Sequence, residues 1–584
     1  MNFAAVYHRT ADQYAYALNE NELVINIRTG KDIDLVYIIV GDPYEAGIMG
    51  GCEKWSGHRE EIYYKKKLKQ HIWWTTTIYP SYKRAKYYFE LHSGDEVYYY
   101  FEDGFYTKEE MENPGKSLSY FICPWMNPAD IFRTPSWVND TCWYQIFPDR
   151  FCNGNPDINP ENVKPWKYEK IEGYRDFYGG DLRGVINKLE YIKNIGINGI
   201  YFTPVFESSS NHKYNTKNYR KIDPCFGTNG DLRELVDKAH ELGIKVMLDA
   251  VFNHTGTDYP LWEDIIEKGE KSEYADWYMI NRFPVEMGRS TKDGRYYSFA
   301  FTDQMPKLNT NKRAVRQYLM DIVDFWIDEF DIDGLRFDVG NEISHLFLTE
   351  LREMTKEKKP DFYLLGEIWH DSIQWLRGTE YDAVMNYPLA TAISNFWVFD
   401  KWDKSEFEYA INQCFTMYMQ QTNDVIFNLL DSHDTNRLMD KVGGNIDIFY
   451  QQLAILYSMP GSPCIYYGTE IAMEGGYDPD CRRCMPWDDI ESGKYDENIQ
   501  ELKKLIELRK NEPAMKSRDF HFPNEIADRR VIEYIKISGD RFVKVVLNCG
   551  HNEVNISVNE ENTLFSRNYL NQKLLPGGIL IYKM

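Results

Sequence analysis

The stretch Gly334-Leu335-Arg336-Phe337-Asp338 is a short apolar run that ends in a charged residue, soon after an amphipathic helical pattern at 314–329. Outward from it, the chain repeats this alternation of apolar runs with helical patterns. The other runs lie at 142–147, 199–202, 245–248, 362–365, 383–385, 425–429 and 464–467, and further helical patterns lie at 181–195, 231–242 and 446–457. Eight strands that alternate with helices predict an α/β fold, a (β/α)8 TIM barrel.

One connection in this pattern is too long for a simple strand–helix unit. Between the runs at 245–248 and 334–337, the helical pattern comes only at the end. Long loops without secondary structure of their own are uncommon inside compact domains. We therefore expect an inserted excursion domain after the third strand, at about 255–310.

Both ends of the chain show the sequence pattern of β-structure. Residues 1–125 contain alternating runs such as Glu22-Leu23-Val24-Ile25-Asn26-Ile27, separated by turn signals. This pattern predicts an N-terminal β-sandwich, and the barrel is then expected at 126–514. Short strand patterns return from residue 531, so we expect a C-terminal β-sandwich domain at 515–584.

The composition limits the class of ligand. The chain has 584 residues with 67 Lys and Arg against 90 Asp and Glu, a formal net charge of −23. Such a charge repels nucleic acids and anionic membranes, so neither is an expected partner, and a neutral substrate fits better. No stretch approaches 18 apolar residues, and the first residues lack a basic segment followed by an apolar one. We therefore expect a cytoplasmic protein.

Charged residues follow four of the predicted barrel strands. The C-terminal ends of barrel strands share one face, so these side chains are expected to surround one site. A metal site is the rival interpretation, although no H-E-x-x-H or comparable spacing supports it. Its candidate ligands would be Asp249, His254, Asp338, Glu367 and His433.

Two of these carboxylates suit general acid and nucleophilic chemistry. Glu367 lies between the apolar run Tyr363-Leu364-Leu365 and Ile368-Trp369, surroundings that favour a protonated acid. Asp338 lies two residues after Arg336, on the same strand face, where a guanidinium favours the ionised form. One protonated and one ionised carboxyl group is the arrangement that glycoside hydrolysis requires.

At these residues the chain resembles the α-amylase superfamily of glycoside hydrolases. Within it, the chain resembles the group of neopullulanases, cyclomaltodextrinases and maltogenic amylases. The segments that carry the resemblance are 249–254, 334–342, 366–370, 430–435, Met305-Pro306-Lys307-Leu308-Asn309 and 382–388.

The resemblance implies retaining hydrolysis of α-glucosidic bonds. It makes Asp338 the nucleophile, Glu367 the acid/base and Asp434 the residue that stabilises the transition state. It also implies a set of residues that bind the substrate. These are His212, Tyr214, Asp249, His254, Arg336, Trp369, His433, Asp478 and Arg482.

A calcium site is also implied by the resemblance. Alternating oxygen-bearing side chains suit a hard cation, but Asn stands at 155 and 159, which lowers the charge of the ligands. The alternative is a loop rich in turn-forming residues and without a metal. The implied ligands are Asn153, Asn155, Asn159, Gly179 and Asp181.

The expected function is hydrolysis of α-1,4 and α-1,6 glucosidic bonds in cyclodextrins, maltodextrins and pullulan, with some transglycosylation. The resemblance also implies a homodimer formed through the N-terminal domain, whose Trp55, Trp73 and Trp74 would bind sugar, meet the partner or fill the core. Three alternatives stay open. They are a catalytically inactive carbohydrate-binding barrel, a related α-glucosidase or transglycosylase, and an unrelated barrel enzyme acting on phosphate esters.

Overall fold

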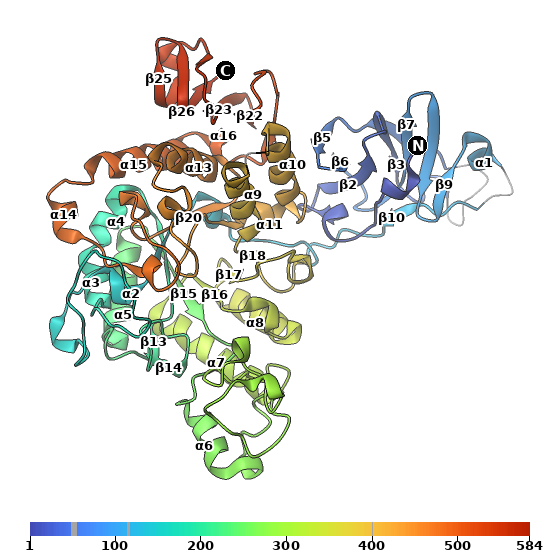
Figure 1. Cartoon of the computed structure of the whole chain (residues 1–584). Coiled ribbons are helices and arrows are strands. Elements are labelled where there is room, and N and C mark those ends of the chain that lie inside the picture. Colours follow the sequence, from blue (N-terminus) through green and yellow to red (C-terminus); the bar gives the residue numbers. More distant parts are fainter. Residues whose placement is uncertain (48–54, 114–116, 400) are drawn as a thin grey trace. The chain divides into compact units, whose positions relative to one another are not determined.

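A computed structural model describes residues 1–47, 55–113, 117–399 and 401–584 (Figure 1). The chain divides into two compact units. The first consists of Met1–Arg133, Ile373–Gly378 and Val398–Asn423. The second consists of Thr134–Ser372, Thr379–Trp397 and Asp424–Met584.

In its described residues, the first unit contains two antiparallel sheets. One has the order β1 (Ala15–Ala17), β2 (Leu23–Gly30), β6 (His71–Ile78) and β5 (Tyr64–Lys67). The other has the order β4 (His58–Glu61), β3 (Leu35–Gly41), β7 (Ala85–Ser93), β8 (Glu96–Phe101) and β9 (Gly104–Tyr106), with β10 (Phe121–Cys123) paired to β7. The helices α1 (Lys108–Glu112) and α10 (Lys404–Cys414) belong to the same unit.

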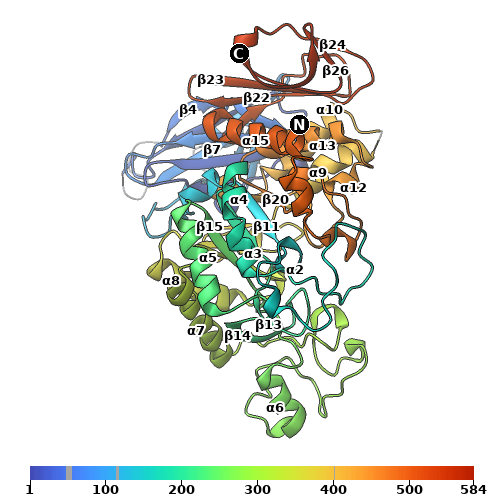
Figure 2. The ribbon, with the colours of Figure 1, turned by 90° about the vertical axis from the view of Figure 1, so that its left-hand side faces the viewer.

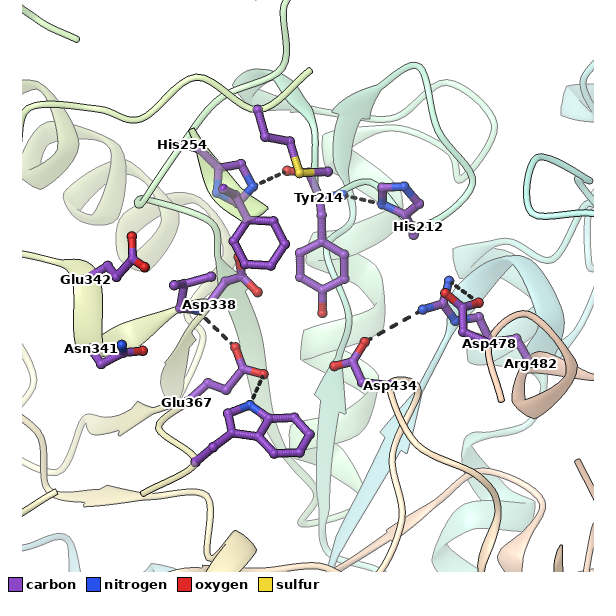
Figure 3. Close-up of a pocket in the computed structure, with 14 residues that line it drawn as sticks. His212, Tyr214, His254, Asp338, Asn341, Glu342, Glu367, Asp434, Asp478 and Arg482 are labelled. Carbon is purple, nitrogen blue, oxygen red and sulfur yellow. Dashed lines mark hydrogen bonds and ion pairs between the residues drawn. The ribbon is translucent and has the colours of Figure 1, made fainter. Parts of the chain in front are cut away.

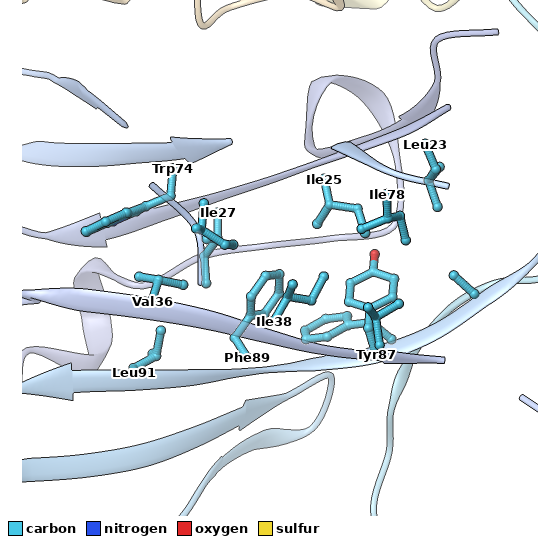
Figure 4. Close-up of a cluster of buried hydrophobic side chains, with 14 of the residues drawn as sticks. Leu23, Ile25, Ile27, Val36, Ile38, Trp74, Ile78, Tyr87, Phe89 and Leu91 are labelled. Carbon is cyan, nitrogen blue, oxygen red and sulfur yellow. The ribbon is translucent and has the colours of Figure 1, made fainter. Parts of the chain in front are cut away.

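The core of this unit follows from the two-residue period of its strands. Ile25 and Ile27 on β2 and Phe89 and Leu91 on β7 are spaced by two, so each pair lies on one face of its sheet and both pairs meet in one buried cluster (Figure 4). The three tryptophans discussed above are buried as well. Trp55, Trp73 and Trp74 are 8%, 6% and 2% exposed.

The second unit contains the predicted barrel, which is confirmed. Its eight parallel strands have the order β18-β17-β16-β15-β12-β11-β20-β19, and a parallel bridge from Met385 to Phe427 links the two ends. The strands are β11 (Trp143–Ile146), β12 (Gly199–Phe202), β15 (Lys245–Ala250), β16 (Gly334–Phe337), β17 (Tyr363–Gly366), β18 (Ala383–Val384), β19 (Phe427–Asn428) and β20 (Ser462–Tyr466). A hairpin of β13 (Phe206–Ser208) and β14 (Thr216–Ile222) follows β12.

The centre of the barrel is filled by inward-facing side chains. Trp143, Tyr201, Met247, Tyr363 and Phe427 come from five different strands and pack together with almost no exposed surface. A filled interior is typical of barrels of this size, which have a packed core and no pore. Functional groups are therefore expected at the ends of the strands.

Helices cover the outside of the barrel (Figure 2). They are α2 (Pro148–Phe151), α3 (Leu182–Asn187), α4 (Leu189–Ile195), α5 (Asn229–Glu241), α7 (Arg313–Phe330), α8 (His345–Lys358), α9 (Tyr387–Val398), α12 (Leu438–Lys441), α13 (Ile446–Ser458), α14 (Trp487–Glu491), α15 (Asp496–Asn511) and α16 (Pro513–Lys516). Helix α11 (Gln420–Val425) begins in the first unit.

Helix α5 shows a start that the sequence marks, whereas α3 and α4 differ from the expectation. Helix α5 is capped by Thr228, the residue before its first turn. The Thr228 side chain accepts from the amide of Asp231 while the Asp231 carboxylate accepts from the amide of Thr228, which is a capping box. The helical pattern at 181–195 differs from expectation. It forms two helices, because Lys188 leaves helical geometry with φ −111° and ψ 7°.

The expected excursion is present between β15 and α7. It contains α6 (Pro260–Lys268) and isolated bridges such as Tyr278 to Leu308 and Ile280 to Tyr296. In its small core, Trp262 packs with Tyr278 and Tyr296. The tyrosine rings meet the indole edge-on, with ring centroids 4.9 and 5.1 Å apart.

The C-terminal part of this unit is an antiparallel sheet. Its order is β21 (Asp519–His521), β22 (Val531–Ser538), β23 (Arg541–Asn548), β26 (Lys573–Lys583) and β24 (Val554–Asn555), with β25 (Thr563–Leu570) paired to β26. Helix α13 packs on β26, where Gln451 Nε2 donates to the carbonyl oxygens of Asn548 and Gly578. Within the described ranges, no helix is long and apolar enough to cross a membrane.

Candidate active site

The register of the barrel strands brings three acidic residues together. On β15 and β16, Asp249 lies opposite Arg336, and on β16 and β17, Phe337 lies opposite Gly366. Asp338 and Glu367 each follow the last paired residue of their strands, so they lie level with each other at the same end of the barrel.

A single guanidinium holds these acids. Nη1 of Arg336 donates to both carboxylate oxygens of Asp249 at 2.8 Å and to Oδ1 of Asp338 at 3.1 Å. Nη2 of Arg336 forms an ion pair at 2.9 Å with Oε2 of Glu367. Burial would lower the pKa of Arg336, but the carboxylates of Asp249 and Glu367 outweigh burial and hold that pKa well above its usual value.

The ionisation of Asp338 differs from the expectation based on its neighbour in sequence. Burial raises its pKa well above the usual value for an aspartate, and the negative charge of Glu367 acts in the same direction. Arg336 opposes both effects without overcoming them. The pKa of Asp249 is likewise raised to about 6, by burial first, against its contacts with Arg336 and two tyrosines.

The surroundings of Glu367 are more polar than the sequence indicated. The amide of Val339 donates to Oε2 at 3.0 Å, and the indole Nε1 of Trp369 donates to Oε1 at 3.3 Å. Together with Arg336, these groups give the carboxylate three polar neighbours. The apolar residues beside it in sequence, Leu365 and Ile368, are buried in the protein.

A chain of hydrogen bonds runs beneath the acids. Gln145 Nε2 donates to Nδ1 of His433 at 2.8 Å, which leaves the proton of this imidazole on Nε2. That nitrogen lies 2.7 Å from Tyr214 Oη and 3.2 Å from Oδ2 of Asp434, and Tyr214 Oη donates to Asp249 at 2.9 Å. Burial lowers the pKa of His433 well below its usual value, so the ring is neutral.

An arginine holds the opposite wall of the site. Arg482 forms an ion pair with Asp478 at 3.1 Å and lies 3.7 Å from Asp434, and its Nε donates to the carbonyl oxygen of His433 at 3.0 Å. Asp434 keeps 36% of its side-chain surface exposed. Its carboxylate is therefore available to a ligand.

The acids and several of the side chains beside them line a pocket of about 540 Å³ (Figure 3). All three carboxylates expected to be catalytic, Asp338, Glu367 and Asp434, line it. Six of the residues expected to bind substrate line it as well, namely His212, Tyr214, His254, Trp369, Asp478 and Arg482.

Three residues expected to bind substrate lie beneath the pocket instead. Asp249, Arg336 and His433 are 2%, 0% and 1% exposed, and they do not line it. The arrangement also counts against the rival metal interpretation. The cationic Arg336 occupies the space between the carboxylates, and His254 donates through Nε2 to the carbonyl oxygen of Tyr214 at 3.1 Å.

The sequence analysis missed five residues that line the pocket. Val339, Asn341 and Glu342 follow Asp338 directly, so their place in a quoted segment was a usable signal. Met305 and Phe299 come from the excursion. Phe299 stacks on the ring of His254 with the centroids 5.5 Å apart, and no sequence pattern pointed to it.

The expected calcium residues fit a cation in part. Asn153 Oδ1 is buried without a hydrogen-bond partner, and Asn153 Nδ2 donates to Oδ1 of Asn159 at 3.1 Å. A Cβ at Gly179 would lie 2.3 Å from Oδ1 of Asn159, so only glycine allows this approach. The carboxylate of Asp181 instead accepts from the amides of Gly154, Asn155 and Gly184 and caps α3.

Comparisons with known proteins agree with this geometry. Residues 145–518 match the family described as alpha amylase, catalytic domain, and residues 1–125 match the alpha amylase N-terminal ig-like domain. The chain is 43% identical to a cyclomaltodextrinase of Geobacillus thermopakistaniensis, over 94% of this chain and 91% of that protein.

Two further similarities extend over nearly the whole chain. An intracellular maltogenic amylase of Bacillus subtilis is 39% identical, over 96% of this chain and 94% of that protein. A solved structure of a cyclomaltodextrinase superposes with a TM-score of 0.88 and 37% identity, over 100% of this chain and 98% of that one.

Proposed function

We propose that the chain, which belongs to the α-amylase family, is a retaining hydrolase of α-glucans. The relatives named above are glycoside hydrolases. Its substrates would be cyclodextrins, maltodextrins and pullulan, cleaved at α-1,4 and α-1,6 bonds. The names of two relatives, cyclomaltodextrinase and maltogenic amylase, support the first two substrates. The observation that carries the proposal is that Asp338 and Glu367 share the guanidinium of Arg336 at the wall of one pocket.

In the proposed reaction, Asp338 reacts in its ionised form, which Arg336 favours against the effect of burial. It attacks the anomeric carbon while Glu367 protonates the glycosidic oxygen. The sugar is then bound covalently to Asp338. Glu367 next removes a proton from water, which attacks the same carbon and releases the product with its configuration retained. A second sugar that takes the place of water gives transglycosylation. Asp434, exposed in the pocket, would hold ring hydroxyls as positive charge develops.

The residues beneath the pocket would keep this geometry. Arg336 fixes Asp338 and Glu367 relative to each other, and neutral His433 with Tyr214 fixes Asp249 and the position of Asp434. Trp369, with half its surface exposed and its ring stacked on Tyr387 at 3.7 Å, offers a flat face to a sugar ring.

We also propose a calcium ion in the loop that contains Asn153 and Asn159. The buried and unpartnered Asn153 Oδ1 supports it, with Asn155, Asn159 and the backbone at Gly179 as further oxygen donors. Bound calcium would tie this loop to the start of α3. Calcium at 100 times its dissociation constant would then stabilise the protein by about 2.7 kcal/mol.

Differential scanning calorimetry with calcium and with EDTA tests this site. Calcium should raise the melting temperature of the wild type and leave that of Asn153→Ala unchanged. Asn218→Ala, an exposed asparagine on β14, is the control and should respond like the wild type. An equal response in all three proteins would contradict the site.

We also propose the oligomeric state and the cellular location. A homodimer formed through the N-terminal unit is supported by the exposed rings of Tyr63, Tyr79 and Tyr82 on that unit. Light scattering during size-exclusion chromatography would give its mass. A cytoplasmic location is supported by the relative named as intracellular, and fractionation of the native host tests it.

Product chromatography tests the proposed function. The wild type is incubated with β-cyclodextrin, pullulan and soluble starch, with Asp338→Asn as the blank. Rapid opening of cyclodextrin, panose from pullulan and slow attack on starch are expected. Identical traces from the wild type and the blank would favour a carbohydrate-binding barrel without activity.

A further inference from the structure

Val339 has a backbone conformation that its side chain disfavours. Its φ of 48° and ψ of 46° lie in the left-handed region, although it is β-branched and buried. Such a residue is a genuine outlier, because its branched Cβ crowds the backbone in this region. A conformation of this kind persists only where the surrounding structure enforces it, and it is typical of functional sites.

The turn at Val339 directs two consecutive amides at one residue. The amide of Val339 donates to Oε2 of Glu367 at 3.0 Å, and the amide of Gly340 donates to the main-chain oxygen of Glu367 at 3.0 Å. Consecutive amides around a left-handed residue form a concavity that binds oxygen atoms. The turn therefore holds both the side chain and the backbone of Glu367.

Several contacts keep the turn in place. Tyr381 Oη donates to the carbonyl oxygen of Gly340 at 3.0 Å, and the amide of Glu342 donates to that of Val339 at 3.0 Å. A Cβ at position 340 would lie 3.2 Å from the nitrogen of Glu367, closer than an ordinary contact. The turn is thus packed directly against the backbone of Glu367.

This arrangement makes the two oxygens of the Glu367 carboxyl group unequal. Oε2 accepts from the amide of Val339 and forms an ion pair at 2.9 Å with Nη2 of Arg336, which donates no hydrogen bond to it. Among the described residues, the one hydrogen bond to Oε1 is the longer contact of 3.3 Å from the indole of Trp369, which lines the pocket. A proton on Oε2 would meet the amide N–H of Val339 and the guanidinium of Arg336, whereas a proton on Oε1 would face the more distant indole N–H of Trp369.

We propose that Val339 is a positioning residue whose strained turn makes Oε1 the oxygen of Glu367 that gives and takes the catalytic proton. This inference rests on the proposed role of Glu367 as acid/base. In the first step, the proton on Oε1 moves to the glycosidic oxygen as its bond to the anomeric carbon breaks and an oxygen of Asp338 bonds to that carbon. The leaving sugar departs as an alcohol, and Glu367 remains as a carboxylate.

The second step restores the acid through the same atom. Oε1 takes a proton from water, whose oxygen bonds to the anomeric carbon and expels the carboxylate of Asp338. The amide of Val339 stays on Oε2 throughout, so the carboxyl group does not rotate between the two steps.

The experiment removes the single N–H donor of Val339. In the full-length enzyme, Val339 is replaced by its α-hydroxy acid counterpart through nonsense suppression, which turns the amide into an ester. The matched control is the same change at Gly340, which removes an amide of the same turn that bonds to the main chain of Glu367. Glu367→Gln serves as the reference for loss of the acid.

Each protein is assayed on maltotriose and on α-maltosyl fluoride. Fluoride departs without a proton, so only maltotriose needs the acid in the first step. The ratio of kcat/KM for the two substrates is independent of the folded fraction, so a poorly folding variant still gives an answer. The ester at 339 should lower kcat/KM for maltotriose about tenfold more than for the fluoride, a part of the roughly 100- to 10,000-fold that general acid catalysis contributes.

The outcomes separate the inference from the proposed function. Equal losses on both substrates for the ester at 339, or the same selective loss for the ester at 340, would overturn the role of Val339. If Glu367→Gln itself shows no selective loss on maltotriose, the role proposed for Glu367 fails instead. A selective loss for Glu367→Gln and for the ester at 339, but not for the ester at 340, is the result we expect.

Discussion

Arg336 is the residue on which the geometry of the site depends. It is fully buried and faces Asp249, Asp338 and Glu367 at distances of 2.8 to 3.1 Å. A planar guanidinium has enough donors in fixed directions to serve three carboxylates, whereas an ammonium group is a single point charge.

Arg336→Lys is therefore expected to lower both activity and stability. We expect kcat/KM on β-cyclodextrin to fall by at least about 100-fold, because positioning errors of this kind are costly, and stability to fall by about 3 kcal/mol. Arg183→Lys is the matched control, since Arg183 also pairs with two acids, Asp231 and Glu234, but is one-third exposed. Equal effects of the two substitutions, measured by kinetics and urea denaturation, would contradict the central role of Arg336.

His8 gives the first unit a dependence on pH. Its Nδ1 donates to the carbonyl oxygen of Asn26 at 2.7 Å and its Nε2 accepts from Tyr87 at 3.0 Å. Burial lowers its pKa from 6.5 to about 4, against the effect of the Asn26 bond. His8 therefore binds a proton more tightly in the unfolded chain than in the folded one. The stability that the neutral, buried His8 contributes is fully present above pH 6.5 and is lost as the pH falls towards 4.

The free energy of unfolding should fall by about 3 kcal/mol between pH 7 and pH 4 through His8. His8→Gln should remove this part of the acid sensitivity in urea titrations of the full chain at both pH values. His58→Gln, at an exposed histidine of the same unit, should leave it unchanged. The prediction is wrong if His8→Gln is as sensitive to acid as the wild type.

At the scale of elements, the sequence predicted the strands better than the connections. Each barrel strand buries both faces, so its apolar run is visible in the sequence without knowledge of the partners. The break at Lys188 and the left-handed turn at Val339 depend on contacts with distant segments. The positions of Asp338 and Glu367 at the ends of their strands were predictable because the strands themselves were. The groups that donate hydrogen bonds to Glu367 could be identified only in the folded chain.

The excursion contributes an apolar wall that only the structure revealed. Phe299 lines the pocket and stacks on His254, while nearby Phe301 is 55% exposed and does not line it. We expect Phe299→Ala to raise KM for maltodextrins several-fold with a smaller change in kcat, because the ring binds substrate and transition state alike. Phe301→Ala is the control, and a larger effect of Phe301→Ala on KM would contradict this assignment.

At the scale of the whole molecule, the net charge of −23 fits a neutral substrate. Association of a charged protein with a neutral sugar has no electrostatic steering to be screened. Raising NaCl from about 0.05 M to about 0.5 M should therefore change kcat/KM on β-cyclodextrin by less than about twofold. A steep fall with salt would indicate that charged groups attract the substrate, contrary to this account.

The most direct test of the whole account is to trap the covalent intermediate. Glu367→Gln is incubated with α-maltosyl fluoride, which reacts without an acid and then waits for a base that the variant lacks. Peptide mass mapping should find a maltosyl group on the peptide that contains Asp338, and none when Asp338→Asn is added. Consumption of the fluoride without an adduct, or an adduct on another carboxylate, would contradict the proposed retaining mechanism.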